Sequence, residues 1–170
     1  GDLTVNQGTV PASATTTVRM AVNLNSNDAV PALPFDVLNP DGTSNFSNNM
    51  TIYDSLGNAH EATVYYAKTA SNSWDWHALV DGAEVGLTAG VPTEGASGTL
   101  TFTTNGALDT ETSAATTWNF VNATPTQSIA FDFGTSITTD AGTGLDGSTQ
   151  FASPEATIAL EQNGYTAGSI

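Results

Sequence analysis

The sequence predicts an all-β fold: an antiparallel β-barrel or sandwich of roughly nine or ten short strands joined by long loops rich in Gly and Thr. Three observations support this class. Apolar residues recur at every second position, and no convincing helical stripe with a period of 3.6 is present. Gly, Asn and Asp interrupt these runs at short intervals. Thr, whose branched Cβ suits a half-exposed pleated sheet, is abundant throughout the chain.

The first two predicted strands lie in the amino-terminal quarter. Apolar residues alternate with polar ones from Val18 to Leu24, which predicts a strand over 18–24. A second alternation covers 33–37. Pro31 and Pro34 place that strand at the edge of a sheet or where the chain enters one, because proline donates no ladder hydrogen bond.

Residues 50–67 predict a β-hairpin. Two alternating runs flank a turn made of Asp54, Ser55, Leu56, Gly57 and Asn58. Asp54 can accept hydrogen bonds from nearby backbone amides, and Gly57 or Asn58 can take the positive φ that a reversal needs. Tyr53 and Tyr65 have the opposite parity to the apolar set. We therefore expect them to face solvent or a neighbouring subunit.

The remaining elements follow the same pattern. Trp74 and Trp76 share the parity of Ala78 and Val80, and short alternations cover 118–120, 129–133 and 158–160. The turns are predicted at Asp81-Gly82 and Asn105-Gly106. A helix at 154–158 is the alternative to the last strand, and its shortness favours strand or coil. The predicted core aromatics are Trp74, Trp76, Phe102, Trp118 and Phe131. The alternative for the tryptophans is a flat face that stacks on sugars.

Charge excludes several kinds of partner. The chain has 17 acidic residues against two basic ones, Arg19 and Lys68, and a formal net charge of −15. Nucleic acid needs clustered Lys and Arg, and anionic membrane surfaces attract cations, so neither is expected as a partner. The acids are dispersed, which is typical of a solvated surface. There is no cysteine, so disulfides and thiol chemistry are excluded.

Residues that could carry chemistry do not form a recognisable pattern. A zinc site would need more convergent ligands than His60 and His77 with Glu61 or Asp75, and both histidines are expected at the surface or at an edge. The acidic turns lack EF-hand spacing, although a weak calcium site stays an alternative. Ser55 lies between Asp54 and His60 but in a strand-to-strand turn, unlike a hydrolase nucleophile. We expect no enzyme activity, no cofactor and no metal.

Several segments together resemble a known family. The run YDSLGNAH at 53–60 is similar to a hairpin signature of bacterial flagellar hook proteins. Further similar segments occur in family order and cover most of the chain: 14–26, 64–69, 73–76, 98–102, 105–108 and 162–168. The stretches 82–98, 103–117 and 134–149 carry no such resemblance.

The resemblance implies a domain organisation and a role. Residues 14–161 would be the outer β-domain of a hook subunit, residues 1–13 would be a flanking segment, and residues 162–170 would return toward the shaft. The terminal segments by which the family polymerises are absent from this sequence. The implied role is structural, in the extracellular hook that transmits motor torque to the filament. The implied partners are copies of itself in a helical tube and, through the parent chain, rod, cap and hook–filament junction proteins. The alternative is a bacterial surface adhesin or carbohydrate-binding domain.

Overall fold

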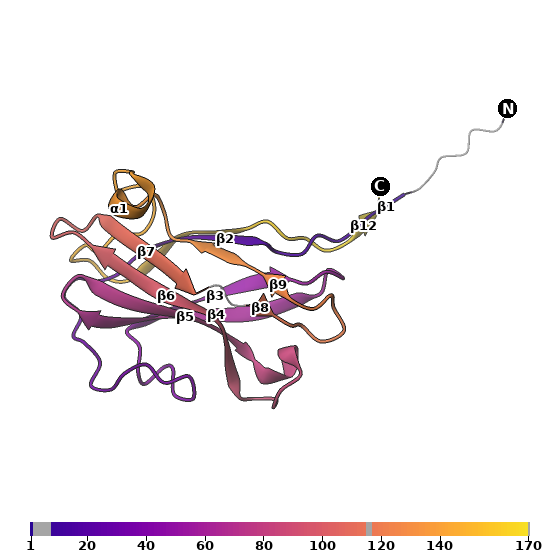
Figure 1. Ribbon diagram of the computed structural model, residues 1–170, viewed down its shortest axis with the longest axis horizontal. Coiled ribbons are helices and arrows are strands. Elements are labelled where there is room, and N and C mark those ends of the chain that lie inside the picture. The colour runs from indigo at the N-terminus through magenta and orange to yellow at the C-terminus, as the bar shows by residue number, and fades with distance from the viewer. Residues whose placement is uncertain (2–7, 115–116, 170) are drawn as a thin grey trace.

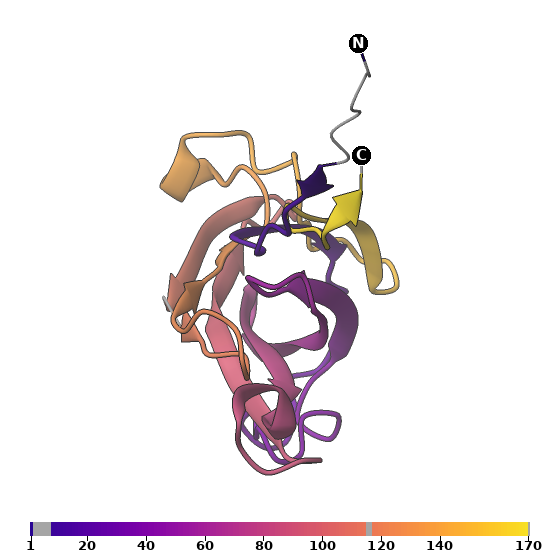
Figure 2. The same cartoon turned by 90° about the vertical axis from the view of Figure 1, so that its right-hand side faces the viewer.

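The computed structural model describes residues 1, 8–114 and 117–169, and within them the fold is β throughout apart from two short helical turns (Figure 1). Its main body consists of two β-sheets packed face to face, and the view along the molecule shows the strands arranged around a common interior (Figure 2). The predicted class, an all-β barrel or sandwich, is confirmed in its sandwich-like form.

The larger sheet is an antiparallel meander of five strands in sequence order. Its strands are β3 (Phe46–Tyr53), β4 (Ala59–Ala70), β5 (Ser73–Asp81), β6 (Pro92–Phe102) and β7 (Leu108–Ala114). Alternate residues of β4 from His60 to Tyr66 are buried, and so are alternate residues of β5 from Trp74 to Ala78. The two-residue periodicity of the sequence therefore marks the face of this sheet that lies toward the core.

The smaller sheet has three strands with β2 (Thr17–Asn23) at its centre. β11 (Ala156–Gln162) pairs with one edge of β2 antiparallel, with a register shift between Thr157 and Ala159. β10 (Ala130–Asp132) pairs with the other edge and is parallel to β2. This sheet joins distant parts of the chain, because β2 lies more than a hundred residues before both of its neighbours.

The remaining elements are short. β1 (Thr9–Val10) pairs antiparallel with β12 (Gly168–Ser169), and β8 (Thr117–Trp118) pairs with β9 (Gln127–Ser128). A 3-10 helix, η1 (Gly82–Val85), follows β5, and a four-residue helix, α1 (Ile137–Asp140), packs against β7. β1 and β12 form a narrow ribbon that projects from one end of the body, so residues 9–10 and 168–169 lie side by side (Figure 1).

The core between the sheets is rich in aromatic rings. Trp74, Trp76, Phe102, Trp118 and Phe131 are all buried there. The ring centroid of Trp76 lies 5.0 Å from that of Phe131 and 4.9 Å from that of Phe133. The indole N–H groups of Trp74 and Trp76 donate to Gln150 Oε1 at 2.6 Å and to the carbonyl of Thr112 at 3.1 Å. Because these polar ends are satisfied, both rings contribute their full apolar area to the core.

The strand predicted at 33–37 is wrong. Residues 31–43 form bends and turns that cross the surface, and the Leu33 side chain is 65% exposed. Asp36 Oδ1 accepts from the amide of Leu38, and the amide of Asp36 donates to Thr43 Oγ1. These local bonds, together with two prolines that cannot donate, give the backbone an alternative to a sheet.

The turn predicted at Asp81-Gly82 also needs correction. Asp81-Gly82 does not form a tight hairpin turn. Instead the chain enters η1 there, and Asp81 accepts from the amides of Ala83 and Gly90. No periodic stripe marks α1 in the sequence, because its four residues are too few for one. The last strand is confirmed as β11, yet Ile158 and Leu160 on it are both exposed.

No helix among the described residues is long and apolar enough to cross a membrane.

Candidate functional site

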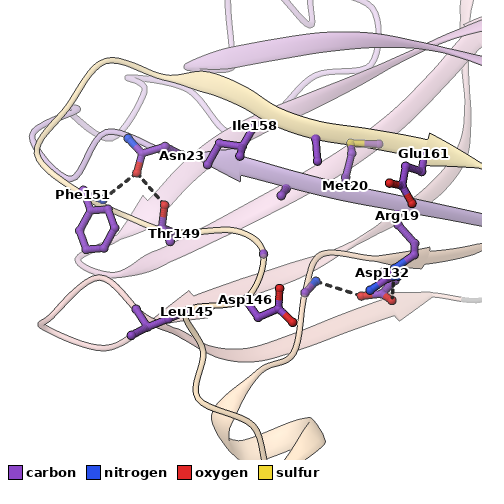
Figure 3. Close-up of a pocket in the computed structure, with 14 residues that line it drawn as sticks. Arg19, Met20, Asn23, Asp132, Leu145, Asp146, Thr149, Phe151, Ile158 and Glu161 are labelled. Carbon is purple, nitrogen blue, oxygen red and sulfur yellow. Dashed lines mark hydrogen bonds and ion pairs between the residues drawn. The ribbon is translucent and has the colours of Figure 1, made fainter.

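A groove with a volume of about 560 Å³ lies between β2, β11 and the loop 145–151 (Figure 3). Arg19 Nε lies 3.3 Å from Asp132 Oδ2 across its mouth, and the Arg19 side chain is 62% exposed. Asp132 Oδ1 also accepts from the amide of Gly134. β2 and β10 thus place at this groove the only ion pair that an Arg or Lys side chain makes among the described residues.

Asn23, the last residue of β2, closes the other end of the groove. Its Oδ1 accepts from Thr149 Oγ1 at 2.9 Å and from the amide of Phe151 at 3.0 Å (Figure 3). Its Nδ2 donates to the carbonyls of Ser153 and Pro154. One buried amide side chain therefore fixes the path of the loop that forms the groove wall.

The groove is suited to contact with another surface. Leu145, Phe151 and Ile158 line it as exposed apolar side chains, with Asp146 and Glu161 beside them. These residues include no nucleophile paired with a base. The described residues also contain no group of three or more His, Asp or Glu side chains that could hold a metal ion. The sequence could not locate this groove, because its walls come from four segments of the chain, 19–23, 132–134, 145–151 and 158–161.

The predicted hairpin turn spans residues 54–58, between β3 and β4. Asp54 is fully buried, and its Oδ1 accepts from the amides of Leu56 at 2.8 Å and Asn58 at 3.0 Å. Gly57 has a φ of 83°. Burial would raise the pKa of Asp54, but hydrogen bonds from His60, Asn58 and Leu56 outweigh it and hold that pKa below its usual value. Ser55 Oγ accepts from the amide of Thr124 and is not hydrogen-bonded to a histidine.

His60 is buried, contrary to the expectation of a surface or edge position. Its Nε2 lies 2.9 Å from Asp54 Oδ2, its Nδ1 contacts Glu84 Oε2, and its ring stacks on Phe120 at 3.9 Å. The sequence separation of 24 residues to Glu84 concealed this site. His77 is placed elsewhere, stacked on Phe35 with its Nδ1 2.5 Å from Glu94 Oε1.

The two tyrosines predicted to face outward are partly covered. Tyr53 and Tyr65 are both half-buried. The Tyr65 ring lies 6.0 Å from that of Phe35, in the loop that replaces the predicted second strand. Burial, with a smaller contribution from Asp41, raises the pKa of the Tyr65 hydroxyl. Part of the surface of Tyr65 is therefore occupied by the chain itself.

Neither basic side chain is a free surface cation. Lys68 is buried, and its Nζ donates to the carbonyls of Ser26 and Asp28 at 2.8 Å each. Arg19 is paired with Asp132, as described above. A surface contact made by the described residues can therefore draw little on Lys or Arg.

Two carboxyl groups are held in settings that favour their neutral form. Burial is the main cause that raises the pKa of Glu111 to about 7, with further contributions from Asp132 and Asp140, while a hydrogen bond from the Phe133 amide opposes it. Burial and a hydrogen bond with Glu155 raise the pKa of Asp28 to about 6, against the attraction of Lys68. The Glu111 carboxyl joins β7 to the amide of Phe133, and the Asp28 carboxyl lies beside Glu155.

Comparison with known proteins gives a consistent result. Residues 23–165 match the family described as "Flagellar basal body protein FlaE D2 domain". The chain is 33% identical over 169 residues to the flagellar hook protein FlgE of Salmonella typhimurium (strain LT2), covering 99% of this chain and 38% of that protein. It is 39% identical over 98 residues to FlgE of Escherichia coli (strain K12), covering 57% of this chain and 23% of that protein. The chain thus spans well under half the length of these relatives.

Solved structures share the fold. A flagellar hook protein FlgE2 from Helicobacter pylori superposes with a TM-score of 0.55 at 10% identity, covering 98% of this chain and 63% of that one. A 32 kDa fragment of FlgE from Caulobacter crescentus superposes with a TM-score of 0.50 at 16% identity, covering 71% and 46%. By its family match and its Salmonella relative, the chain belongs to the FlaE D2 domain family of flagellar hook proteins.

Proposed function

We propose that this chain is the outer β-domain of a flagellar hook subunit, a structural and non-enzymatic part of the extracellular hook that takes part in motility. The single observation that carries the proposal is the D2 family match over residues 23–165. The parent subunit would assemble with copies of itself into a helical tube and adjoin rod, cap and hook–filament junction proteins at the ends of that tube. Residues 14–161 would form the outer domain, with 1–13 and 162–170 as the two connections to the shaft.

The paired ends of the chain support this placement. β1 and β12 run antiparallel with Thr9 opposite Ser169, and Ser13 and Tyr165 exchange backbone hydrogen bonds of 2.9 and 2.8 Å. The two connections of the body therefore leave together at one end (Figure 1). A domain inserted into a longer chain needs this geometry, because its host must continue from nearly the point at which it was interrupted.

The surface supports weak contacts between neighbouring copies. A tube that bends as it rotates must lengthen and shorten its contacts, and small, wet, polar contacts can do this at little cost. Three large apolar side chains, Leu145, Phe151 and Ile158, are exposed at the groove, and the acids Asp146 and Glu161 lie beside them. Tyr53, half-buried at the end of β3, and the uncovered part of Tyr65 are further proposed contact residues.

Immunogold electron microscopy of the source bacterium tests the location. Antibodies raised against the folded chain should decorate the hook, between the cell surface and the filament. Label spread over the cell surface, without hooks, would indicate the adhesin alternative instead. Tryptophan fluorescence is an independent check: the indoles of Trp74, Trp76 and Trp118 are buried, so added glycans should not quench them.

Sedimentation tests the weak contacts. We expect the isolated chain to be a monomer at micromolar concentration, because its net charge of −15 opposes association. Assembly of the full-length parent should become more favourable as salt screens this repulsion. A tight dimer of the isolated chain, or assembly that is insensitive to ionic strength, would contradict the proposed contacts.

A further inference from the structure

His60 lies at the meeting point of three loops. The loops are the hairpin tip 54–58, the η1 turn 82–86 and the segment 118–124. The His60 side chain is only 8% exposed, and its ring stacks on Phe120 with an interplanar angle of 12°. The same loops are also joined by two hydrogen bonds: the amide of Val121 donates to the carbonyl of Glu84, and the amide of Thr124 donates to Ser55 Oγ.

Both ring nitrogens of His60 face carboxylates. Nε2 lies 2.9 Å from Asp54 Oδ2, and Nδ1 is within hydrogen-bond distance of Glu84 Oε2. An ionised carboxylate can only accept, so each contact requires an N–H on the ring, whereas a neutral imidazole has one N–H. Asp54 is held ionised by the amides of Leu56 and Asn58 in addition to His60. With both carboxylates ionised, the geometry is satisfied in full only by a ring that carries both protons.

The charged groups around His60 are few among the described residues. Asp54 from the hairpin tip and Glu84 from η1 face the ring, and the residues packed on it from β3 and from 118–124 are the apolar Ile52 and Phe120. Glu61, the next residue along β4, is hydrogen-bonded to Thr51 instead. No positive group therefore competes with the imidazolium for these two carboxylates.

His77 provides a natural contrast within the same chain. Its Nδ1 lies 2.5 Å from Glu94 Oε1, and its ring stacks on Phe35. Its Nε2 is buried without a hydrogen-bond partner among the described residues. One carboxylate needs only one N–H, so the arrangement at His77 is compatible with a neutral ring.

We propose that His60 is held as the doubly protonated imidazolium and acts as a proton-dependent clasp that joins the hairpin tip to η1 and, through η1, to 118–124. Loss of one proton leaves a lone pair facing a carboxylate. Asp54 is fully buried and fixed by backbone amides, whereas the Glu84 side chain is 39% exposed. Glu84 therefore moves into solvent, and η1 separates from the hairpin tip while the two sheets stay intact.

Nuclear magnetic resonance of the ¹⁵N-labelled chain tests the clasp directly. Long-range ¹H–¹⁵N spectra of the ring should show two protonated nitrogens for His60 at neutral pH. When the pH is raised until one proton leaves, the backbone signals of Ser55, Glu84 and Val121 should shift in the same step. The protection of the Val121 amide against exchange should fall about tenfold in that step, because η1 loses the charge-assisted hydrogen bond between the Glu84 carboxylate and His60 that holds the Glu84 carbonyl in place. A His60 ring with a single proton at neutral pH overturns the proposal.

Glu84→Gln and Glu94→Gln form a matched pair of variants, each neutralising the carboxylate beside one histidine. A glutamine can accept from Nδ1–H or donate to a bare Nδ1, so Glu84→Gln removes the need for the second proton. The coupled shift at Ser55 and Val121 should disappear in Glu84→Gln and persist in Glu94→Gln. Glu84 is partly exposed, so folding should survive. A coupled shift that persists in Glu84→Gln, or that disappears in Glu94→Gln, refutes the clasp.

Discussion

Replacing Asp54 with Ala should destabilise the domain more than any other single change at a turn. Asp54 accepts from the amides of Leu56 and Asn58, from the Asn58 side chain at 3.0 Å, and from His60 Nε2. Water can replace the aspartate at the exposed turn residues, at about 0.5–1 kcal/mol for each bond, whereas the buried histidine loses a charged partner worth about 1.5–3 kcal/mol. We expect a total loss of about 3–6 kcal/mol, or roughly 10–20 °C in melting temperature for a domain of this size.

Asp81→Ala is the matched control for this prediction. Asp81 also accepts from two backbone amides, those of Ala83 and Gly90, but it is exposed and contacts no histidine. Its loss should cost about 1 kcal/mol in urea unfolding. Equal losses in the two variants would show that the buried bond to His60 adds nothing, and would refute the reasoning.

The pH dependence of Asp54→Ala provides a second check. The folded protein lowers the pKa of Asp54 from its ordinary 3.8, so the stability contributed by its carboxylate is present above 3.8 and is lost as the pH falls through the folded value. The difference in unfolding free energy between the parent protein and Asp54→Ala should therefore narrow in acid. A difference that stays constant down to about pH 2 would contradict the role of the ionised carboxylate.

Three further changes should have distinct effects. Lys68→Met keeps the apolar stem but removes both hydrogen bonds to the carbonyls of Ser26 and Asp28. Urea unfolding should therefore show an unfolding free energy lower by about 2–3 kcal/mol. The control Arg19→Met, at the surface, should lower it by less than about 1 kcal/mol. Gly98→Ala places a Cβ 1.9 Å from the Thr112 carbonyl oxygen and 2.6 Å from Trp76 Nε1. It should therefore lower the unfolding free energy by about 3 kcal/mol or more and alter tryptophan fluorescence. An unchanged melting temperature would contradict this close packing of β6 and β7. The pKa of Glu111 is raised to about 7, so the stability that its protonated form contributes is complete below pH 4.5 and is lost as the pH rises through 7. Glu111→Gln should remove this loss of stability at higher pH. Parallel profiles of unfolding free energy for the parent protein and Glu111→Gln from pH 5 to pH 8 would refute this.

The sequence revealed the parts of the fold that depend on nearby residues. The hairpin at 54–58 follows from Asp54, Gly57 and Asn58 alone, and the structure shows the amide bonds and the positive φ that these residues provide. The buried face of β5 follows from the parity of Trp74 and Trp76. In both cases the controlling residues lie within a few positions of one another.

The sequence failed where distant segments meet or where local hydrogen bonds override periodicity. Residues 33–37 alternate like a strand, but Asp36 and Thr43 satisfy the backbone locally. His60 looked like a surface residue because its partners Glu84 and Phe120 are supplied by other loops. The groove beside Arg19 could not be predicted, because it requires the parallel pairing of β2 with β10 and the loop fixed by Asn23.

The antiparallel ribbon of β1 and β12 also determines how the domain responds to mechanical load. A force that pulls its two ends apart acts on the Thr9–Ser169 and Val10–Gly168 pairs one after the other, so it unzips the ribbon rather than shearing it. The next attachments in line are the Ser13–Tyr165 bridge and the Asn163 side chain, which accepts from the amides of Thr16 and Thr17. Because β1 and β12 are adjacent, tension applied to these two strands crosses this short ladder and bypasses the aromatic core. The ribbon can thus open by a few residues and close again while the sandwich behind it keeps its shape.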